Sequence, residues 1–577
     1  MRNPPIAVWA AMLAFPLLVH ADEDPPPPSR FNEATVADLQ AQMASGRLTS
    51  VDLTSFYLQR IGQLDEKGPR LNSIIEINPD ALSIAAAADA ERRRGIVRGP
   101  LHGIPVLLKD NIDTGDGMQT TAGSLALAGL PAVQDSTIAA RLRAGGAVIL
   151  GKTNLSEWAN FRSFFSTSGW SGRGGLTRNP YSLDRNACGS SSGSGAAVSA
   201  NLAAVSLGSE TDGSIVCPAN VNGVVGLKPT VGLTSRAGVV PISHVQDTVG
   251  PHTRTVADAA ALLGVIQSRT FDGRDPATGG VPLGWRGRSR PTNIPADYTQ
   301  FLDANGLRGA RVGVTRQGVD NAPPQVAAAF DAAIAAIEAA GAMIVDLDAA
   351  GFTFPSPDGE FLVLLYDFKV DVQKYFATRA GVPMAGKTLA DAIAFDEAHA
   401  AAEMPFFFQE IFELAQQIDT SSPDAPQPLF GGMTYNQALD IDQNAGVNGV
   451  DLALSRYGLD AVVAPTDGPA WTTDLINSDH FIFASSGLAA APGYPIVQVP
   501  AGMVLGVPVG ISFIGTAFSE PTLIKLASGF EAATHARVVP KFAPSLPVGS
   551  PGVPLGPPSR GEHKDERRDA DRRPHRM

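Results

Sequence analysis

Residues 189–214 read GSSSGSGAAVSANLAAVSLGSETDGS, and Gly or Ser occupies 13 of these 26 positions. A flexible linker has such a composition, but two apolar runs interrupt this one, AAV at 196–198 and LAAV at 202–205. These runs predict helix and strand, so the glycines are expected in tight loops of a packed fold. Glycine lets backbone N–H groups approach a ligand closely. Such loops can form an anion-binding nest beside a nucleophile.

The sequence on both sides of this stretch alternates apolar runs with helical patterns. Strands are predicted at 106–108, 147–150, 310–314, 343–347, 460–464, 496–499 and 509–514. A capped amphipathic helix follows Thr49-Ser50, and a second helix spans about 325–340. We therefore predict an α/β fold, with a central mixed sheet covered by helices on both faces.

Residues 355–430 differ from the rest, because they are mostly helical in pattern and rich in aromatic residues. Helices are expected at 361–376 and 389–412, and Pro405 should break or kink the second. Phe406–Phe408 and Phe412 allow two interpretations. They belong to helices packed on the core, or they form an aromatic rim over a substrate pocket.

Composition excludes several classes of protein. The 577-residue chain is 44% hydrophobic, which supports a large core, and its formal net charge is −13. The negative charge argues against general attraction to nucleic acid or anionic lipid. No apolar run reaches the ~20 residues of a membrane helix. Cys188 and Cys217 are too few for a disulfide framework or a four-ligand zinc site; we interpret both as packing residues and leave their pairing open.

The two ends of the chain differ from the body. Arg2, an apolar stretch at 6–19 and a small-residue site predict a signal peptide over 1–21, with an uncleaved anchor as the alternative. A Pro-rich spacer occupies 22–30, and 31–542 is treated as one domain. Residues 543–577 are rich in proline and then in charge, which predicts a disordered tail. The expected location is outside the cytoplasm, periplasmic or secreted.

Two motifs suggest functions that their context opposes. Residues 146–153 match the phosphate-loop pattern G-x4-G-K-T, but the variable positions read AVIL and should themselves be strand, so nucleotide binding is rejected. Residues 189–193 match G-x-S-x-G around Ser191, yet the preceding residues 179–186 are turn-like where a nucleophile elbow needs a strand. A triad built on Ser191 stays a minor alternative. The histidines show no metal spacing, so no metal or cofactor is expected.

The chain contains four separated sequence motifs whose combination and order are too specific to arise by chance. They are GIPVLLKDN at 103–111, SSSGS at 190–194, TDGSI at 211–215 and GLKPT at 226–230. DTVGP at 247–251 agrees as a fifth. With these motifs the chain resembles the amidase signature family, which implies the amidase signature fold over most of its length.

The resemblance implies a Ser–Ser–Lys triad, with Ser214 as nucleophile, Lys109 as base and Ser190 between them. A serine hydroxyl needs an adjacent base. Lysine has a free pKa of ~10.4, so it must lose its proton to serve as that base. Because Lys109 follows the apolar residues 106–108, we expect a strand end to place it in a partly desolvated pocket that lowers its pKa.

The resemblance also implies an oxyanion hole made by the backbone N–H groups of Thr211, Asp212, Gly213 and Ser214. Ser191 is a candidate pocket hydroxyl or relay helper. The common family form T-D-T-G-G-S is replaced by SETDGS at 209–214, so an Asp stands where a Gly is usual and has less backbone freedom. Val216 replaces a common Arg, which argues against a substrate carboxylate clamped there. With NLSEW at 154–158, these features are similar to the peptide amidase branch.

These residues together predict an exported serine amidohydrolase. It would cleave a linear carboxamide, such as a C-terminal peptide amide or a small acyl amide, through an acyl-enzyme and release ammonia. The expected partner is this small-molecule or peptide substrate, without nucleic acid, stable membrane insertion, metal or cofactor. Two alternatives remain: one component of a glutamine-dependent tRNA amidotransferase, and a non-catalytic binding protein on the same scaffold.

Overall fold

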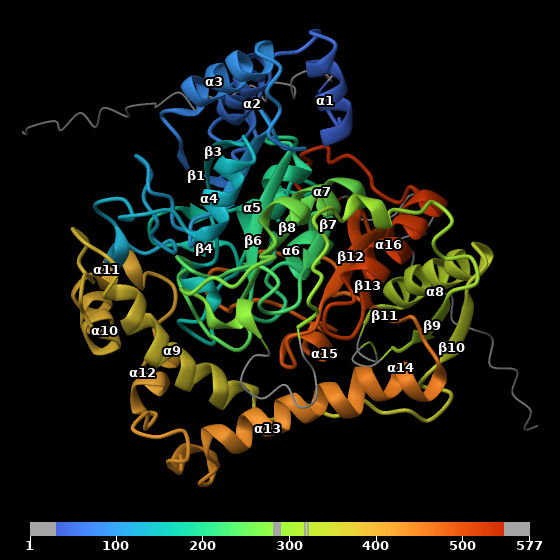
Figure 1. Cartoon of the computed structure of the whole chain (residues 1–577). Coiled ribbons are helices and arrows are strands. Elements are labelled where there is room, and N and C mark those ends of the chain that lie inside the picture. Colours follow the sequence, from blue (N-terminus) through green and yellow to red (C-terminus); the bar gives the residue numbers. More distant parts are fainter. Residues whose placement is uncertain (1–30, 281–289, 317–318, 320–321, 547–577) are drawn as a thin grey trace, which may run out of the picture.

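The computed structural model describes residues 31–280, 290–316, 319 and 322–546 (Figure 1). The predicted signal peptide, the spacer and residues 547–577 of the predicted tail lie outside the described residues. Within the described ranges, none of the helices combines the length and the apolar character needed to span a bilayer.

One mixed sheet of 11 strands runs through the whole molecule. In spatial order its strands are β1 (Ile74–Ile77), β3 (Val148–Thr153), β2 (Pro105–Lys109), β6 (Val205–Glu210), β8 (Thr248–Thr253), β7 (Val225–Lys228), β12 (Ile496–Val504), β13 (Val507–Ile514), β11 (Ala461–Pro465), β9 (Arg311–Val314) and β10 (Met343–Asp346). Pairing is parallel for β3–β2–β6 and for β11–β9–β10, and antiparallel between the other neighbours. β4 (Trp170–Ser171) and β5 (Gly175–Leu176) form a separate hairpin.

Helices surround this sheet (Figure 1). They are α1 (Val36–Ala44), α2 (Ser50–Leu64), α3 (Ala81–Arg93), α4 (Thr137–Ala144), α5 (Ser192–Ser199), α6 (Val216–Val221), α7 (Val256–Ile266), α8 (Pro324–Ala339), α9 (Glu360–Phe376), α10 (Leu389–Ala398), α11 (Ala400–Glu403), α12 (Glu410–Gln417), α13 (Tyr435–Gly446), α14 (Leu452–Tyr457), α15 (Gly487–Ala490) and α16 (Glu520–Thr534).

Strand β11 shows how both faces of the sheet are covered. Ala461 and Val463 pack in the cluster that contains the apolar side chains of α8 and α16. Val462 and Ala464 pack instead with Val216 of α6. Since alternate residues of a strand point to opposite faces, helices cover both. The α/β prediction is confirmed.

The predicted elements recur with small shifts in their bounds. Thr49 caps α2 with a capping box, and the βαβ pattern appears as β9, α8 and β10, with the two strands parallel. In the segment that matches the phosphate-loop pattern, residues 148–150 of the AVIL run lie within buried strand β3. That segment is therefore a core strand, as the argument against nucleotide binding required.

The aromatic-rich region forms a second apolar cluster below the sheet in the view of Figure 1. As predicted, the helical pattern of 389–412 is interrupted around Pro405, between α11 and α12. Phe407 and Phe412 are buried, whereas Phe406 and Phe408 are exposed. Burial of Phe412 against Trp158 and Phe368 favours the core interpretation for that residue.

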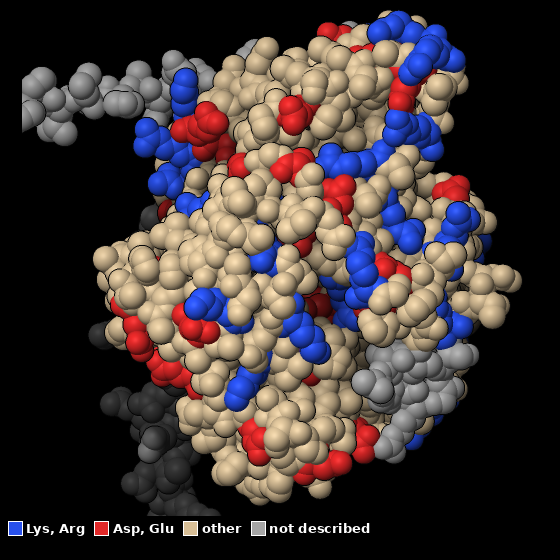
Figure 2. Space-filling model, turned by 60° about the vertical axis from the view of Figure 1, so that its left-hand side comes forward, with Lys and Arg blue, Asp and Glu red and all other residues tan. Residues whose placement is uncertain are grey.

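The charged side chains show no broad single-sign area on the face drawn in Figure 2, where basic and acidic residues are interspersed. Charge is therefore distributed over this face and not concentrated in one region.

Candidate active site

Two parallel strands bring the sequence motifs to one edge of the sheet. Lys109 is the last residue of β2 and Glu210 the last of β6, and these strands pair directly. The carboxyl ends of parallel strands meet at the same edge of the sheet. Lys109 therefore lies beside the loop that follows β6. That chain continues through Ser214 into α6, and Ser190 and Ser191 lead into α5.

Lys109 is fully buried, and its described hydrogen-bond partners are all neutral. Its Nζ donates to Ser190 Oγ at 2.7 Å, to Ser209 Oγ at 3.0 Å and to the Ser209 carbonyl at 3.3 Å. Burial lowers the pKa of Lys109 to about 7, against the opposing attraction of Asp247 and Glu210. Desolvation disfavours the ammonium form, so this amine can exchange a proton near neutral pH.

Ser209 is a contact that the sequence did not assign. Its Oγ also accepts a hydrogen bond from Asn111 Nδ2 at 2.8 Å, so two motif segments meet on this hydroxyl. The only sequence signal was its place in SETDGS, where a Ser replaces the first Thr of the common pattern. A small hydroxyl at that position still provides an acceptor for the amine.

Ser190 and Ser214 approach each other through the backbone. The Gly189–Ser190 peptide is cis, and the N–H of the next residue, Ser191, donates to the Ser214 carbonyl at 3.2 Å. Residue Ser214 keeps 8% exposure, whereas Ser190 is fully buried. Among the described contacts, a hydrogen bond joins Lys109 to Ser190 but none joins Ser190 Oγ to Ser214 Oγ.

Ser191 has contacts that suit a structural hydroxyl. Its Oγ donates to the Ser209 carbonyl at 3.0 Å and accepts from the Ser209 N–H at 3.2 Å. Nearby His252 binds the Ile215 carbonyl through Nε2, and burial lowers the pKa of His252 to about 3. Within the described residues no hydrogen bond links Ser191 to a histidine, which weakens the Ser191 triad.

The loop from Thr211 to Ser214 is fixed at both ends. Glu210 Oε2 accepts the N–H groups of Ile215 and Val216 at 2.6 and 3.0 Å, at the start of α6. Thr211 Oγ1 donates to Asp247 Oδ1 at 2.6 Å. Gly213 has φ +76°, a conformation that non-glycine residues rarely adopt. The Asp at 212 is therefore accommodated, while the position that needs glycine keeps it.

Cys188 and Cys217 form a disulfide bond. The bond connects the residue before Gly189 to α6, so it fastens the two loops that carry Ser190 and Ser214. Both cysteines also pack among buried apolar side chains. The sequence interpretation as packing residues was incomplete, because spacing alone could not show that the two chain segments meet.

A cavity of about 370 Å³ opens beside these loops. Gly189, Gly213 and the disulfide form part of its wall. Its aromatic residues are Phe164, Trp471 and Phe481. They come from segments other than 406–412, so the interpretation of Phe406–Phe408 and Phe412 as a rim over this cavity is not supported.

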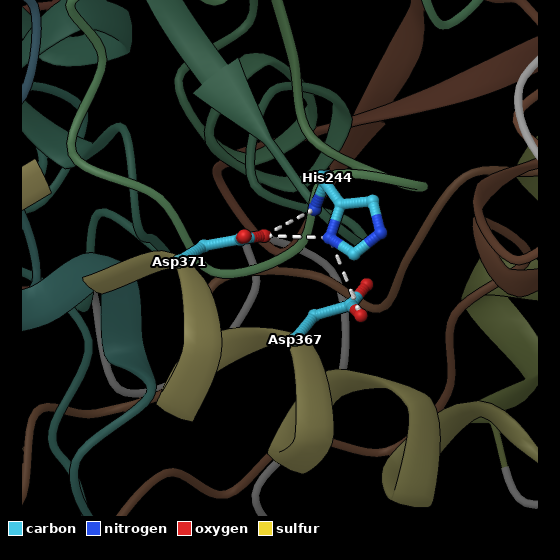
Figure 3. A group of neighbouring side chains, drawn as sticks. All are labelled: His244, Asp367 and Asp371. Carbon is cyan, nitrogen blue, oxygen red and sulfur yellow. Dashed lines mark hydrogen bonds and ion pairs between the residues drawn. The ribbon is translucent and has the colours of Figure 1, made fainter. Parts of the chain in front are cut away.

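A cluster of charged residues lies next to the segment 243–247, whose Asp247 accepts the hydrogen bond from Thr211. His244 Nδ1 lies 2.7 Å from Asp371 Oδ2 and 3.4 Å from Asp367 Oδ1, with both carboxylates on α9 (Figure 3). Hydrogen bonding to Asp371 and the nearby Asp367 raise the pKa of His244, although burial opposes them. The residue types could bind a metal ion, but Lys374 also contacts Asp371 at 3.0 Å. Asp371 therefore pairs with both His244 and Lys374, and the cluster is described by these contacts within the protein.

Comparisons with known proteins agree over nearly the whole described chain. The amidase family model matches residues 52–524. A probable amidase of Arabidopsis thaliana is 42% identical over 523 residues, covering 88% of this chain and 92% of that protein. The native peptide amidase from Stenotrophomonas maltophilia is 47% identical with TM-score 0.79, covering 89% of this chain and all of that one (100%).

One component of the glutamyl-tRNA(Gln) amidotransferase of Chloroflexus aurantiacus is 32% identical over 514 residues, covering 88% of this chain and 98% of that protein. The likeness to the peptide amidase is thus higher in identity, and the motifs agree with that branch. With the sheet, the lysine–serine contact and the family match in place, this chain belongs to the amidase signature family and is an amidase, a hydrolase of amide bonds.

Proposed function

We propose that the chain is a serine amidohydrolase that removes ammonia from linear carboxamides, including C-terminal peptide amides. Lys109 is the base, Ser190 the relay and Ser214 the nucleophile. The observation that carries the proposal is the 2.7 Å contact from the buried Lys109 amine to Ser190 Oγ. The name of the Stenotrophomonas maltophilia enzyme supports peptide amides as the substrate class.

The hydrogen bonds of Lys109 suit a neutral amine. Such an amine has two N–H groups and one lone pair. The charged amine donates to Ser190 Oγ and to both oxygens of Ser209. Once it is neutral, its N–H groups can still donate to the carbonyl and hydroxyl of Ser209, and its lone pair can accept from the Ser190 O–H. This arrangement leaves the Ser190 oxygen free to accept the proton of Ser214.

The reaction then runs in two balanced halves. Ser214 Oγ bonds to the carbonyl carbon while its proton passes through Ser190 to Lys109. The tetrahedral oxyanion is stabilised by backbone N–H groups of residues 211–214. Lys109 returns the proton through Ser190 to the leaving nitrogen, the C–N bond breaks, and ammonia departs. Water attacks the acyl-enzyme by the same route, which gives the carboxylic acid and restores Ser214.

Labelling with a fluorophosphonate tests the assignment. We expect one covalent adduct, mapped by mass spectrometry to Ser214, and loss of both labelling and ammonia release in Ser214→Ala. Ser191→Ala is the matched control, because Ser191 lies in the same loop system and should keep the label. A label on Ser191 would instead establish the alternative triad, and no label would favour a non-catalytic binding protein.

The likeness to the amidotransferase component provides a second candidate. The purified chain distinguishes the two functions. Ammonia release from a peptide amide by the chain alone supports the hydrolase. Activity that appears only with added partner proteins and glutamine supports the amidotransferase.

We also propose that the mature protein acts outside the cytoplasm. Support comes from the signal-like residues 1–21 and from the Cys188–Cys217 disulfide, since stable disulfides are uncommon in reducing compartments. N-terminal sequencing of the protein from its native cell should find a start near Asp22. Retention of Met1 on a cytoplasmic protein would contradict export.

A further inference from the structure

The cavity beside the Ser214 loop is acidic. Three aspartates line it, Asp212, Asp467 and Asp479, and none of its described lining residues is Lys, Arg or His. This differs from the mixed charges on the face in Figure 2. Such a lining offers an anionic ligand no basic partner, whereas a carboxyl that ionises on binding can pair with a cationic one.

Asp467 differs from the other two because nothing in the described part of the protein satisfies it. The residue follows strand β11 and is only 1% exposed. Neither carboxyl oxygen has a hydrogen-bond partner among the described residues. Buried polar groups nearly always have one, so an unmatched carboxyl in a cavity wall indicates a group that arrives with the ligand.

Asp479 provides the internal contrast. Its oxygens accept from the N–H of Ser168 at 3.1 Å and from Trp471 Nε1 at 3.1 Å. That carboxylate therefore holds the cavity wall together. Asp212 is exposed at the cavity and has a side-chain hydrogen bond with Ser486. Asp467 is therefore the unpartnered carboxyl of the wall, and Asp212 is an accessible second one.

Aromatic side chains complete the lining. Trp471 packs edge-to-face with Phe481, with ring centroids 5.8 Å apart, and Phe164 is more than half exposed. Aromatic faces attract ammonium and guanidinium groups. Carboxyls and aromatic rings together form a surface suited to a positively charged nitrogen.

We propose that this cavity binds the acyl portion of the substrate and selects acyl groups that carry a positively charged nitrogen, with Asp467 and Asp212 as specificity-determining residues. The inference rests on the proposed function: when ammonia is the leaving group, only the acyl portion is large enough to fill the cavity. The preferred substrates are then amides of cationic residues, such as a peptide ending in lysinamide.

Protonation accounts for an unpaired carboxyl in the free enzyme. Burial, with the neighbouring Glu210 and Asp212 carboxylates, raises the pKa of Asp467 well above its usual range. A substrate ammonium takes the place of that proton, which leaves to solvent. The cation and the carboxylate then satisfy each other.

Three peptide amides that differ only in the last residue test the proposal: lysinamide, norleucinamide and the α-amide of glutamic acid. With the wild-type enzyme we expect kcat/KM for lysinamide at least tenfold above norleucinamide, and the glutamic acid amide lowest. Asp467→Asn and Asp212→Asn should each reduce the lysinamide preference severalfold. Glu66→Gln, which removes an exposed charge after α2, is the control and should keep the full preference.

Binding to Ser214→Ala separates this inference from the proposed function. Calorimetry should show tighter binding of the lysinamide peptide than of the norleucinamide peptide, and Asp467→Asn in the same background should remove the difference. If the wild-type enzyme releases no ammonia but this binding preference appears, the hydrolase proposal fails and the cation subsite stands. Equal binding of the two peptides, or a preference unchanged in both aspartate variants, overturns the subsite.

Discussion

Lys109 and Lys152 lie at the ends of neighbouring parallel strands, and both are fully buried. Lys152 Nζ donates to the Ile112 carbonyl at 2.7 Å and to Thr120 Oγ1 at 2.8 Å, and Asp110, Asp113 and other carboxylates near it favour its charge. Lys109 binds two serine hydroxyls and a carbonyl. The two lysines are therefore equally buried but have different hydrogen-bond partners.

The difference lies in which hydroxyl each amine contacts. A carbonyl only accepts, whereas a hydroxyl can also donate to a neutral amine. Lys152 contacts the hydroxyl of Thr120, and Lys109 contacts that of Ser190. Lys228, also buried, again donates to a carbonyl, that of Tyr494 at 2.6 Å. Burial lowers the pKa of all three lysines. Of the three, Lys109 alone combines that shift with a serine hydroxyl beside a candidate nucleophile.

The largest expected effect is on Lys109. Lys109→Met keeps the length of the side chain and removes the base, so kcat should fall by about 10³-fold or more. Ammonia release under saturating peptide amide measures the loss, and circular dichroism checks folding. A variant that is folded and fully active would show that another group accepts the proton of Ser214.

The same change in the neighbouring strand should affect folding and not chemistry. Lys152→Met removes two buried hydrogen bonds, to the Ile112 carbonyl and to Thr120 Oγ1, which costs about 1–3 kcal/mol of unfolding free energy. Urea denaturation measures this loss. The rate per folded molecule should stay within about twofold, because Lys152 contacts neither candidate catalytic serine. A large fall in kcat at unchanged stability would contradict a purely structural role for Lys152.

The pH profile gives the next effect. Since the pKa of Lys109 is lowered to about 7 by burial, kcat/KM should rise with pH through about 7 and level off above it. One unit below that pKa, the rate should be about tenfold lower, because only the neutral amine accepts the proton. Lys152→Met should reproduce this profile. A flat profile from pH 5 to 9 would contradict the assignment of Lys109 as the base.

Much of this arrangement could be predicted from the sequence, and for identifiable reasons. The apolar run before Lys109 marked a buried strand, and the capping pair Thr49-Ser50 marked α2. The motif order then associated Lys109 with Ser190 and Ser214, residues far apart in the chain. Local patterns encode local structure, and the resemblance to the family supplied the long-range pairing.

Other features depend on contacts that no local pattern specifies. The disulfide required Cys188 and Cys217 to lie 6.0 Å apart at their Cα atoms, although 29 residues separate them. The acidic cavity likewise depends on tertiary structure, because Asp467, which follows β11, lines the same cavity as Asp212. In both cases the tertiary packing brings together two residues that are distant in the sequence, and composition alone does not predict that.

The smallest expected effect concerns Ser209, which we predict to position Lys109. Ser209→Ala removes an acceptor from the Lys109 ammonium, so the charged form loses stabilisation and the acidic limb of kcat/KM should move to lower pH, by up to about one unit. The plateau should fall by about threefold to tenfold, since one hydrogen bond contributes roughly 0.5–1.5 kcal/mol. Ser206→Ala is the matched control, because Ser206 lies on the same strand and donates to the Ser194 carbonyl at 2.8 Å. If both variants keep the acidic limb of the wild-type pH profile, Ser209 has only a packing role in the strand. Ser190 is then the one hydrogen-bond partner that affects the pKa of Lys109.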